Sequence, residues 1–261
     1  MNLIKSALRT VIKILTQLGF DFKKIISLKF YPRFRQHKKE WISKGGVIHY
    51  NYMILDDFED YAGVTKSEYF HQDLLVANYI YKNNPKRHVD IGSRIDGFVA
   101  HVASFRKIEV VDIRSLENSE HENIKFIQAD LIKIDNLGEV DSISCLHVIE
   151  HFGLGRYGDA IDIDGHNKGI RNLVNLVSKN GYLYISFPIA DEDQVYFNAN
   201  RRFKFDTIFK HPSIKEFMKL IRFDFIDEFG NLHTDIKIND FDVNFNKKYG
   251  CGIYTFKKIS D

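Results

Sequence analysis

From residue 68 onward, short apolar runs alternate with segments in which apolar residues recur every three to four positions. The second kind of segment predicts helices at 68–82, Phe98–Phe105 and Lys168–Val177. The apolar runs predict five strands: His88–Ile91, Glu109–Ile113, Lys125–Gln128, Asp141–Leu146 and Tyr182–Phe187, the last ended by Pro188. Strands that alternate with helices in this way predict an α/β fold with a doubly wound, mostly parallel sheet.

The pattern changes towards the end of the chain. A helix is expected near Ser213–Ile221, and two strand-like runs follow it, "FDFIDEF" at 223–229 and "GIYTFKKI" at 252–259. Gly230 and Asn231 supply a turn after the first run. We expect the two runs to pair as antiparallel strands at the edge of the sheet.

The first part of the chain is a separate, basic segment. Residues 1–40 hold ten Lys/Arg and two acidic residues, a net charge of +8, which leaves −6 for the rest of the chain. Apolar residues recur at helical spacing while basic residues lie away from that stripe; the two sets are Ile4, Leu8, Val11, Leu15 and Leu18, and Lys5, Arg9 and Lys13. Residues 41–66 have weak periodicity. We therefore expect two parts, a basic amphipathic N-terminal arm with its connector at 1–66 and an α/β domain at 67–261.

The arm could pack on the domain, dock on a partner protein or lie on an anionic membrane surface, because each of these asks for the same apolar stripe. Its basic residues interrupt the apolar run every four positions, so neither a membrane span nor a signal-peptide core is expected. Nucleic acid ranks below a small molecule or glycan as a partner, because the domain is acidic and shows no interleaving of basic and aromatic residues. No nucleic-acid partner is therefore predicted.

Length and composition predict one main core. The chain has 261 residues, of which 44% are hydrophobic, enough for one substantial domain with a small extension. Its two cysteines, Cys145 and Cys251, match no metal-binding or redox spacing. Nothing here indicates an oxidising compartment, so a cytoplasmic location is expected, with a peripheral place at the inner face of the membrane as a further option.

Five motifs follow the expected strands in a fixed order: "VDIGSRIDG", "VVDIR", "FIQAD", "DSISCLHVIEHF" and "LVSKNGYLYISFP". With the antiparallel pair at the end, they make residues 70–258 resemble the Rossmann-like fold of class I S-adenosylmethionine-dependent methyltransferases. More narrowly, "HVDIGSRIDGF", "HFGLGRYGD" and "YFNANRRF" look like an uncharacterised methyltransferase-like family of bacterial proteins that is often associated with genes for surface polysaccharides. The resemblance implies S-adenosylmethionine as the cofactor.

In the resembled fold, the acid that ends the first strand and the glycines after it let the backbone approach the methionine part of the cofactor. Asp90, Gly92 and Gly97 match these positions. Gly97 comes one residue later than the usual third glycine, as though the loop had gained a residue, and Arg94 and Asp96 depart from the pattern. Arg94 could swing aside or hold the methionine carboxylate. The alternative is a loop that has lost the cofactor and only turns the chain.

The resemblance implies two further contacts with the nucleoside. Asp112 matches the acid that accepts hydrogen bonds from both ribose hydroxyls, and Asp130 matches the position that meets the adenine amino group, with a backbone contact from Ala129. An acid after the second strand also occurs in NAD-binding folds. Asp96 argues against NAD, because a carboxylate near the start of the helix would repel the phosphates, whereas a cationic sulfonium tolerates it.

The segment after the fourth strand lies beside the reactive methyl group in the resembled fold. His147 and His151 are the first candidates for a general base, followed by Asp159, with Arg156 and Tyr157 as positioning groups. His151 could instead orient the loop through a backbone hydrogen bond. A metal-binding histidine pair is disfavoured because spacing fixes no third ligand.

Three aspartates, Asp159, Asp162 and Asp164, alternate with apolar residues and could hold magnesium. The run lacks the twelve-residue calcium-loop pattern, so a solvated acidic turn is favoured and no metal site is predicted.

A polar segment follows the fifth strand and is well placed to cover the acceptor. Asn198, Arg201 and Arg202 are candidate acceptor-binding residues, and paired arginines could clamp a phosphate or carboxylate, which predicts an anionic acceptor. The alternative is that these arginines pair with the acidic run at 191–193.

These observations predict a methyltransferase that O-methylates a sugar or sugar-linked precursor in surface glycan biosynthesis, with the sugar supplied by the resemblance. Two alternatives stay open. One is a cofactor-free, Rossmann-like scaffold in a glycan-assembly complex; the other is a metal-dependent nucleotide-sugar transferase that uses the aspartate run.

Overall fold

The structure, a computed structural model, describes residues 11–260 apart from 13, 118, 135–136 and 245–248, and gives only the backbone at 242–244. The chain divides between Val64 and Thr65 into two compact units, and each is described by itself. Among the described residues, no helix is both long and apolar enough to cross a membrane.

The N-terminal unit is helical. Residues 11–12 and 14–17 form helix, and four elements follow: α2 (Phe22–Ser27), η1 (Leu28–Phe30), α3 (Tyr31–Ser43) and η2 (Asp56–Glu59). The described residues include three members of the expected apolar stripe, Val11, Leu15 and Leu18. The other two members, Ile4 and Leu8, lie outside the described residues, as do the basic residues Lys5, Arg9 and Lys13.

Aromatic and charged contacts tie the connector of this unit back to its helices. The ring of Phe58 lies 5.6 Å from that of Phe30, and the guanidinium of Arg33 stacks on Phe58 at 4.5 Å. Lys23 pairs with Asp60 at 2.7 Å, but exposed ion pairs contribute little to stability. The aromatic contacts are therefore the main link between these two segments.

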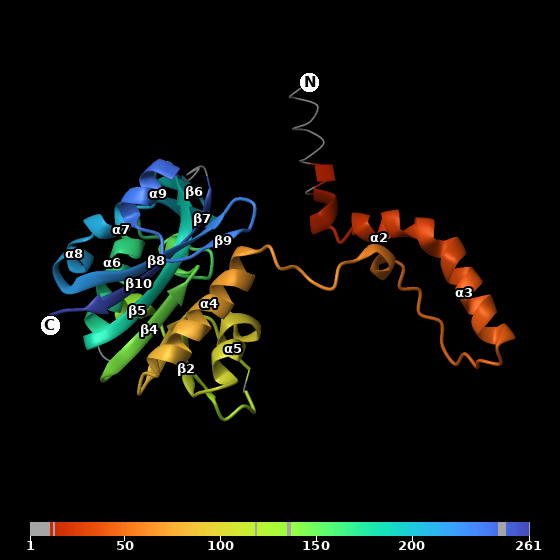
Figure 1. Ribbon diagram of the computed structural model, residues 1–261, viewed down its shortest axis with the longest axis horizontal. Helices are drawn as coiled ribbons and strands as arrows, with labels where there is room; N and C mark the ends of the chain where they lie inside the picture. Colours follow the sequence, from red (N-terminus) through yellow and green to blue (C-terminus); the bar gives the residue numbers. More distant parts are fainter. Residues whose placement is uncertain (1–10, 13, 118, 135–136, 245–248, 261) are drawn as a thin grey trace, which may run out of the picture. The chain divides into compact units, whose positions relative to one another are not determined.

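The C-terminal unit is built on a twisted sheet whose strand order is β3-β2-β1-β4-β5-β10-β8-β9 (Figure 1). The strands of the described residues are β1 (His88–Ile91), β2 (Ile108–Asp112), β3 (Ile124–Gln128), β4 (Val140–Leu146), β5 (Val177–Ala190), β6 (Gln194–Tyr196), β7 (Asn200–Lys204), β8 (Met218–Asp227), β9 (Leu232–His233) and β10 (Gly250–Lys258). Strands β1 to β5 pair in parallel, β10 is antiparallel to both of its neighbours, and the β6–β7 hairpin joins β5 through β7. The predicted fold class is confirmed.

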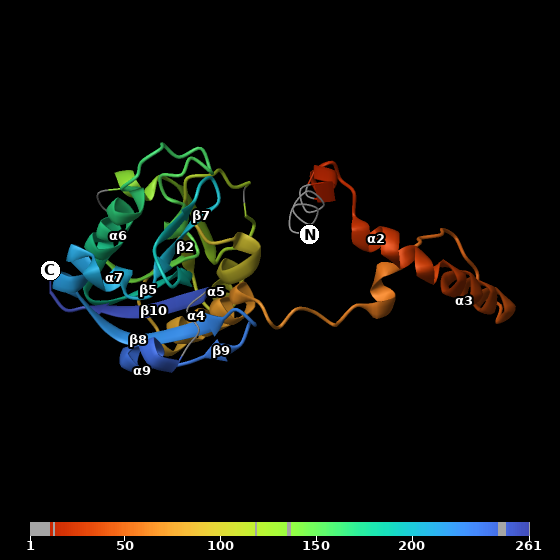
Figure 2. The ribbon, with the colours of Figure 1, turned by 90° about the horizontal axis from the view of Figure 1, so that it is seen from above.

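Helices cover both faces of the sheet, with α4 and α5 on one face and α6, α7 and α8 on the other (Figure 2). Their bounds, with those of the remaining helices and turns, are α4 (Glu68–Asn83), η3 (Ile95–Val99), α5 (Ala100–Ala103), η4 (Leu131–Lys133), η5 (Ile149–His151), α6 (Gly165–Leu176), α7 (Thr207–Lys210), α8 (Pro212–Phe217) and α9 (Ile238–Asn244). Helix α4 shows how the sequence sets these bounds: the Ser67 hydroxyl accepts from the Phe70 amide, and Asn84 ends the helix in a left-handed conformation.

Two predicted boundaries are wrong at the C-terminal side of the sheet. Pro188 does not end the fifth strand, since it pairs opposite Cys251 and β5 continues to Ala190. The helix expected at Ser213–Ile221 stops at Phe217, because the next residues pair with β10, with Leu220 opposite Phe256. In both places the long antiparallel partner β10 overrides the local preference.

A chain of buried hydrogen bonds runs along the middle of the sheet, between β1 and β4. His88 lies between two serine hydroxyls, with Nδ1 2.7 Å from Ser142 and Nε2 3.2 Å from Ser144. Ser144 donates to the Asp90 carboxylate at 2.5 Å, and Asp90 also accepts from the amide and hydroxyl of Ser93. Burial lowers the pKa of His88 to about 3 and raises that of Asp90 to about 7.

The loop after β1 depends on a glycine. Gly92 has φ +72°, and a Cβ built there would lie 2.7 Å from Cγ1 of Val148, just after β4. The loop then forms one wide, π-type turn, η3, in which Gly97 has non-helical angles. Such a turn takes up one residue more than an α-helical turn, which accounts for the late position of Gly97.

Replacing His88 by glutamine should weaken the loss of stability in acid. Between pH 6.5 and about 4 the unfolded chain protonates His88 and the folded chain does not, so this residue costs the wild type up to about 1.4 kcal/mol of unfolding free energy per pH unit as pH falls. Urea unfolding at pH 7.5 and 5.0 gives the change in unfolding free energy for the wild type and for His88→Gln. The difference between these two changes cancels the opposite pH dependence that Asp90 contributes to both proteins. His121→Gln, at an exposed position, is the control; equal losses in the wild type and His88→Gln would contradict the prediction.

Gly92→Ala and Gly158→Ala form a matched pair. Both glycines have positive φ, which costs alanine about 1–2 kcal/mol, but only Gly92 also meets a neighbouring side chain, at a further cost of about 1–3 kcal/mol. Chemical denaturation should show the larger loss for Gly92→Ala. An equal loss would mean that Val148 moves freely out of the way.

Candidate functional site

Two adjoining cavities lie where the first four strands end. The first, of about 80 Å³, is lined by the ends of β1, β2 and β3 and by the segment after β4. The second, of about 740 Å³, extends from the loop after β1 to the start of α4. Five residues line both: Gly92, Arg114, His147, His151 and Tyr157. Ligands of open α/β sheets bind at this end of the strands.

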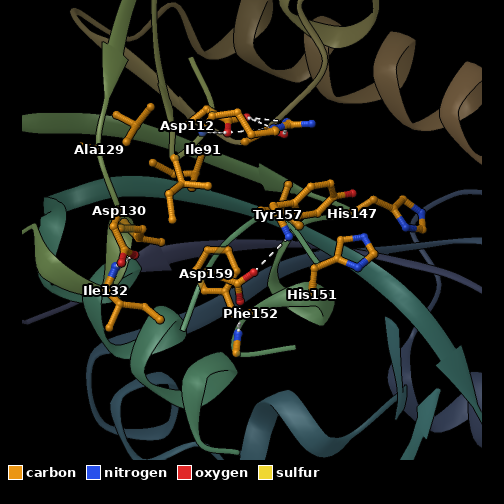
Figure 3. Close-up of a pocket in the computed structure, with 17 residues that line it drawn as sticks. Ile91, Asp112, Ala129, Asp130, Ile132, His147, His151, Phe152, Tyr157 and Asp159 are labelled. Carbon is orange, nitrogen blue, oxygen red and sulfur yellow. Dashed lines mark hydrogen bonds and ion pairs between the residues drawn. The ribbon is translucent and has the colours of Figure 1, made fainter. Parts of the chain in front are cut away.

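The first cavity contains the residues expected to meet a nucleoside (Figure 3). Asp112, Ala129 and Asp130 lie on one side of it, and His147, His151 and Tyr157 lie on the other. The Ala129 amide donates to the Asp112 carbonyl at 2.9 Å, and one Asp130 oxygen accepts from the Ile132 amide at 3.0 Å. The sheet thus brings three sequence-predicted residues from two strands into one cavity.

The carboxylate of Asp112 forms an ion pair with the side chain of Arg114. Its Nε lies 3.0 and 3.2 Å from the two carboxylate oxygens, and its amide donates to the first of them at 2.8 Å. The Tyr157 ring lies under this guanidinium at 4.8 Å and under that of Arg156 at 5.2 Å. The side chains of Arg114 and Tyr157 narrow the first cavity. Both are partly exposed, so neither is held in place by burial.

The loop after β1 borders the second cavity. A Cβ at Gly97 would come within 3.2 Å of the Asp73 carboxylate on α4, so glycine keeps this side open. Arg94 pairs with Asp96 at 2.7 Å, and both side chains are exposed. Asp90 lines neither cavity; it lies beneath the loop and holds it through Ser93.

The segment after β4 presents a buried ion pair. His147 takes a left-handed conformation, φ +54°, and its Nδ1 lies 3.0 Å from Oε1 of Glu150. Burial lowers the pKa of His147, but Cys251 and Glu150 raise it, and it lies well above the ordinary 6.5. Burial raises the pKa of the Cys251 thiol, which is neutral at neutral pH, so the Glu150 carboxylate is the neighbour that favours the imidazolium.

His151 differs from His147 in its environment. Its Nδ1 donates to the carbonyl of Ala199 at 2.7 Å, and Arg156 donates to the same carbonyl at 3.0 Å. Burial lowers the pKa of His151, so the ring is neutral at neutral pH and its Nε2 carries a lone pair. His151 therefore makes the backbone hydrogen bond that would orient the loop, and it also lines both cavities, as a candidate base would.

The three aspartates of the acidic run serve separate parts of the loop. Asp159 accepts hydrogen bonds from the amides of Gly153, Gly155 and Tyr157, and Asp162 pairs with Lys168 at 2.6 Å. Asp164 accepts from the Asn167 amide group. Within the described part of the chain, no three His, Cys, Asp or Glu side chains converge as metal ligands.

The expected arginine clamp is not formed. Arg201 and Arg202 are successive residues of β7, so their side chains point to opposite faces. Arg201 is buried and donates to the Phe152 carbonyl at 2.6 Å, whereas Arg202 stacks on Tyr196 and Tyr249. Asn198, in the hairpin turn, lines neither cavity. Of the residues expected to bind the acceptor, only Arg156 and Tyr157 border the cavities.

Several residues at this site were not predicted. Glu150 stands between the two histidines in the sequence, so its proximity to them could have been expected from the motif. Glu68, Asp73 and Tyr249 come from α4 and from the residue before β10, and no local pattern points to them.

Comparisons with known proteins agree with this architecture. The 1,6-didemethyltoxoflavin-N1-methyltransferase of Burkholderia thailandensis, solved with S-adenosylhomocysteine, has a TM-score of 0.52 at 11% identity, over 92% of this chain and 89% of its own. The [4+2]-cyclase SpnF has a TM-score of 0.54 at 11% identity, over 84% of this chain and 91% of its own. An O-methyltransferase from a polyketide synthase of Brevibacillus brevis, also solved with S-adenosylhomocysteine, has a TM-score of 0.50 at 12% identity, over 72% of each chain. At these identities the likeness establishes the fold.

No curated protein matches the sequence. A family model described as "Caenorhabditis protein of unknown function, DUF268" matches residues 106–255, which run from just before β2 into β10 and include more than half of the chain. The protein therefore belongs to the DUF268 family.

Proposed function

We propose that this protein is an S-adenosylmethionine-dependent methyltransferase. The observation that carries the proposal is the pair of adjoining cavities: acids at the ends of β2 and β3 line the first, the glycine loop borders the larger second one, and Gly92 lines both. Fold alone does not select methyl transfer, because a cyclase shares it. The site residues therefore carry the argument.

The residues present suit an adenosyl cofactor. Asp112 would hold the ribose hydroxyls after Arg114 turns away, Asp130 and the backbone of Ala129 would meet adenine, and Gly92 and Gly97 leave room for the methionine part. Arg94, once released from the exposed Asp96, has the charge to hold the methionine carboxylate. Asp90 supports the loop from below. When bound, the cofactor supplies an activated methyl group on a sulfonium.

Methyl transfer requires an acceptor atom in line with the methyl group, and a base when that atom is an unactivated hydroxyl. Of the three residues expected as bases, His151 fits best, since its ring is neutral and it lines both cavities. The buried His147 favours the protonated form, and Asp159 is occupied by backbone amides. Among the three, His151 would be the one to take up the proton of an acceptor hydroxyl.

The narrower proposal is O-methylation of a sugar or sugar-linked precursor in surface glycan biosynthesis. It is supported by the size and polar lining of the second cavity and by the resemblance of three motifs to the polysaccharide-associated bacterial family. A cytoplasmic location, and a contact of the basic arm with a membrane surface or a partner protein, stay predictions from the sequence.

A second candidate is a cofactor-free scaffold. The observation that favours it is the pair between Arg114 and Asp112, in which the protein's own side chain takes up the carboxylate proposed to hold the ribose. Calorimetry with S-adenosylhomocysteine separates the two proposals: saturable binding supports the methyltransferase, and its absence supports the scaffold.

Asp112→Asn should weaken the binding of S-adenosylhomocysteine at least tenfold, because an amide replaces a charged acceptor of two ribose hydrogen bonds, each of about 1.5–3 kcal/mol. Titration calorimetry gives the dissociation constant, and circular dichroism checks the fold. Asp162→Asn, which lines neither cavity, should bind as the wild type does. Unchanged affinity in Asp112→Asn would refute this placement of the nucleoside.

A further inference from the structure

The second cavity is bordered by a row of ionisable groups, of which the sequence analysis had singled out only His147. Glu68, the first residue of α4, has Oε2 3.5 Å from Nε2 of His147, whose Nδ1 lies 3.0 Å from Glu150. Tyr249 lines the same cavity; its pKa is raised by burial and by the charge of Glu68, with which it forms a hydrogen bond. Residues from α4, from η5 and from the position just before β10 therefore meet at one place.

Of the groups in this row, only the Glu68 carboxylate presents a charge to the second cavity. Nε2 of His147 and Oε2 of Glu150 have no exposed surface and no hydrogen-bond partner, so neither atom reaches a ligand directly. The Glu68 side chain is 20% exposed and lines the second cavity. The carboxylate of Glu68 is thus the member that a ligand would touch, with His147 behind it.

The cations around the second cavity are committed elsewhere. Arg94 pairs with Asp96, Arg114 pairs with Asp112, and Arg156 donates to a backbone carbonyl. Arg201 and Arg202, expected from the sequence to hold an anion, are not among the residues that line this cavity. With these arginines in their present contacts, a phosphate or carboxylate placed beside Glu68 would meet the negative charge of its carboxylate.

The shared lining of the two cavities marks where the proposed donor would pass from one to the other. Gly92 and His147 line both cavities, and Glu68 lines only the larger one, within 3.5 Å of His147. A donor that fills the first cavity and crosses into the second would bring its reactive carbon to the part of the larger cavity that His147 lines, with Glu68 in contact with His147 and with His151 as the neighbouring candidate.

We infer that Glu68, in place of His151, accepts the hydrogen bond from the amino or hydroxyl group that is methylated, so that the acceptor presents a hydrogen-bond donor, not an anionic oxygen, at this end. The inference rests on the proposed function, whose cofactor places the methyl group at the junction. Glu68 determines which acceptors bind, while His147 and Glu150 position its carboxylate from behind.

The test uses sinefungin, an adenosyl analogue in which a carbon bearing a primary amine replaces the methyl-bearing sulfur. Its protonated amine stands where the methyl group would be and needs no knowledge of the acceptor. The wild type should bind sinefungin more tightly than S-adenosylhomocysteine. Glu68→Gln should weaken sinefungin at least tenfold, because a charged hydrogen bond is lost, and leave S-adenosylhomocysteine unchanged. Titration calorimetry on the full chain measures all four constants.

Two further variants complete the experiment. Glu216→Gln, on the exposed side of α8, should leave both affinities unchanged. His151→Gln tests the neighbouring histidine: if it removes the preference for sinefungin and Glu68→Gln does not, His151 is the group that faces the methyl position and the inference is wrong. Equal loss of both ligands in Glu68→Gln would place Glu68 against the adenosyl or methionine part and would also overturn it.

The absence of any preference for sinefungin in the wild type contradicts the inference alone. If S-adenosylhomocysteine fails to bind the wild type, the proposed function itself fails, and the inference falls with it.

Discussion

The site depends on a line of buried hydrogen bonds between β1 and β4. Ser142, His88, Ser144, Asp90 and Ser93 follow one another from the start of β1 to the loop beyond it. Every link is buried, so breaking one would leave a polar group without a partner in a low-dielectric interior. Because the line ends on Ser93, the position of the loop at the cavity is set by the register of two strands in the core.

The sequence revealed the fold where apolar runs are short and bounded. All five parallel strands were predicted, and β1 was predicted with its observed bounds. Errors fell where a distant strand decides the conformation: residues 218–220 continue a helical pattern locally but pair with β10. No pattern in those residues reports a partner more than thirty positions away, so pairing over such distances could not be predicted from local periodicity.

The site was predictable to the extent that it lies at strand ends. Asp112 is the last residue of β2 and Asp130 comes two residues after β3, and the sheet brings them to one cavity. Asp90 was expected to touch the ligand, but its hydrogen bonds turn inward to Ser93 and Ser144. The arginines of β7 looked like a pair in sequence and are separated by strand geometry. Glu68 and Tyr249 reach the cavity only through tertiary packing.

The contact between Arg114 and Asp112 has a consequence for any measured affinity. A ligand that needs Asp112 binds only the molecules in which Arg114 has moved away from this carboxylate. The apparent dissociation constant is therefore the intrinsic constant divided by the fraction of such molecules. The Arg114 side chain is 45% exposed, so added salt screens its attraction to the carboxylate and enlarges the open population. Higher ionic strength would then tighten the binding of an uncharged nucleoside, the reverse of its usual effect on contacts between opposite charges.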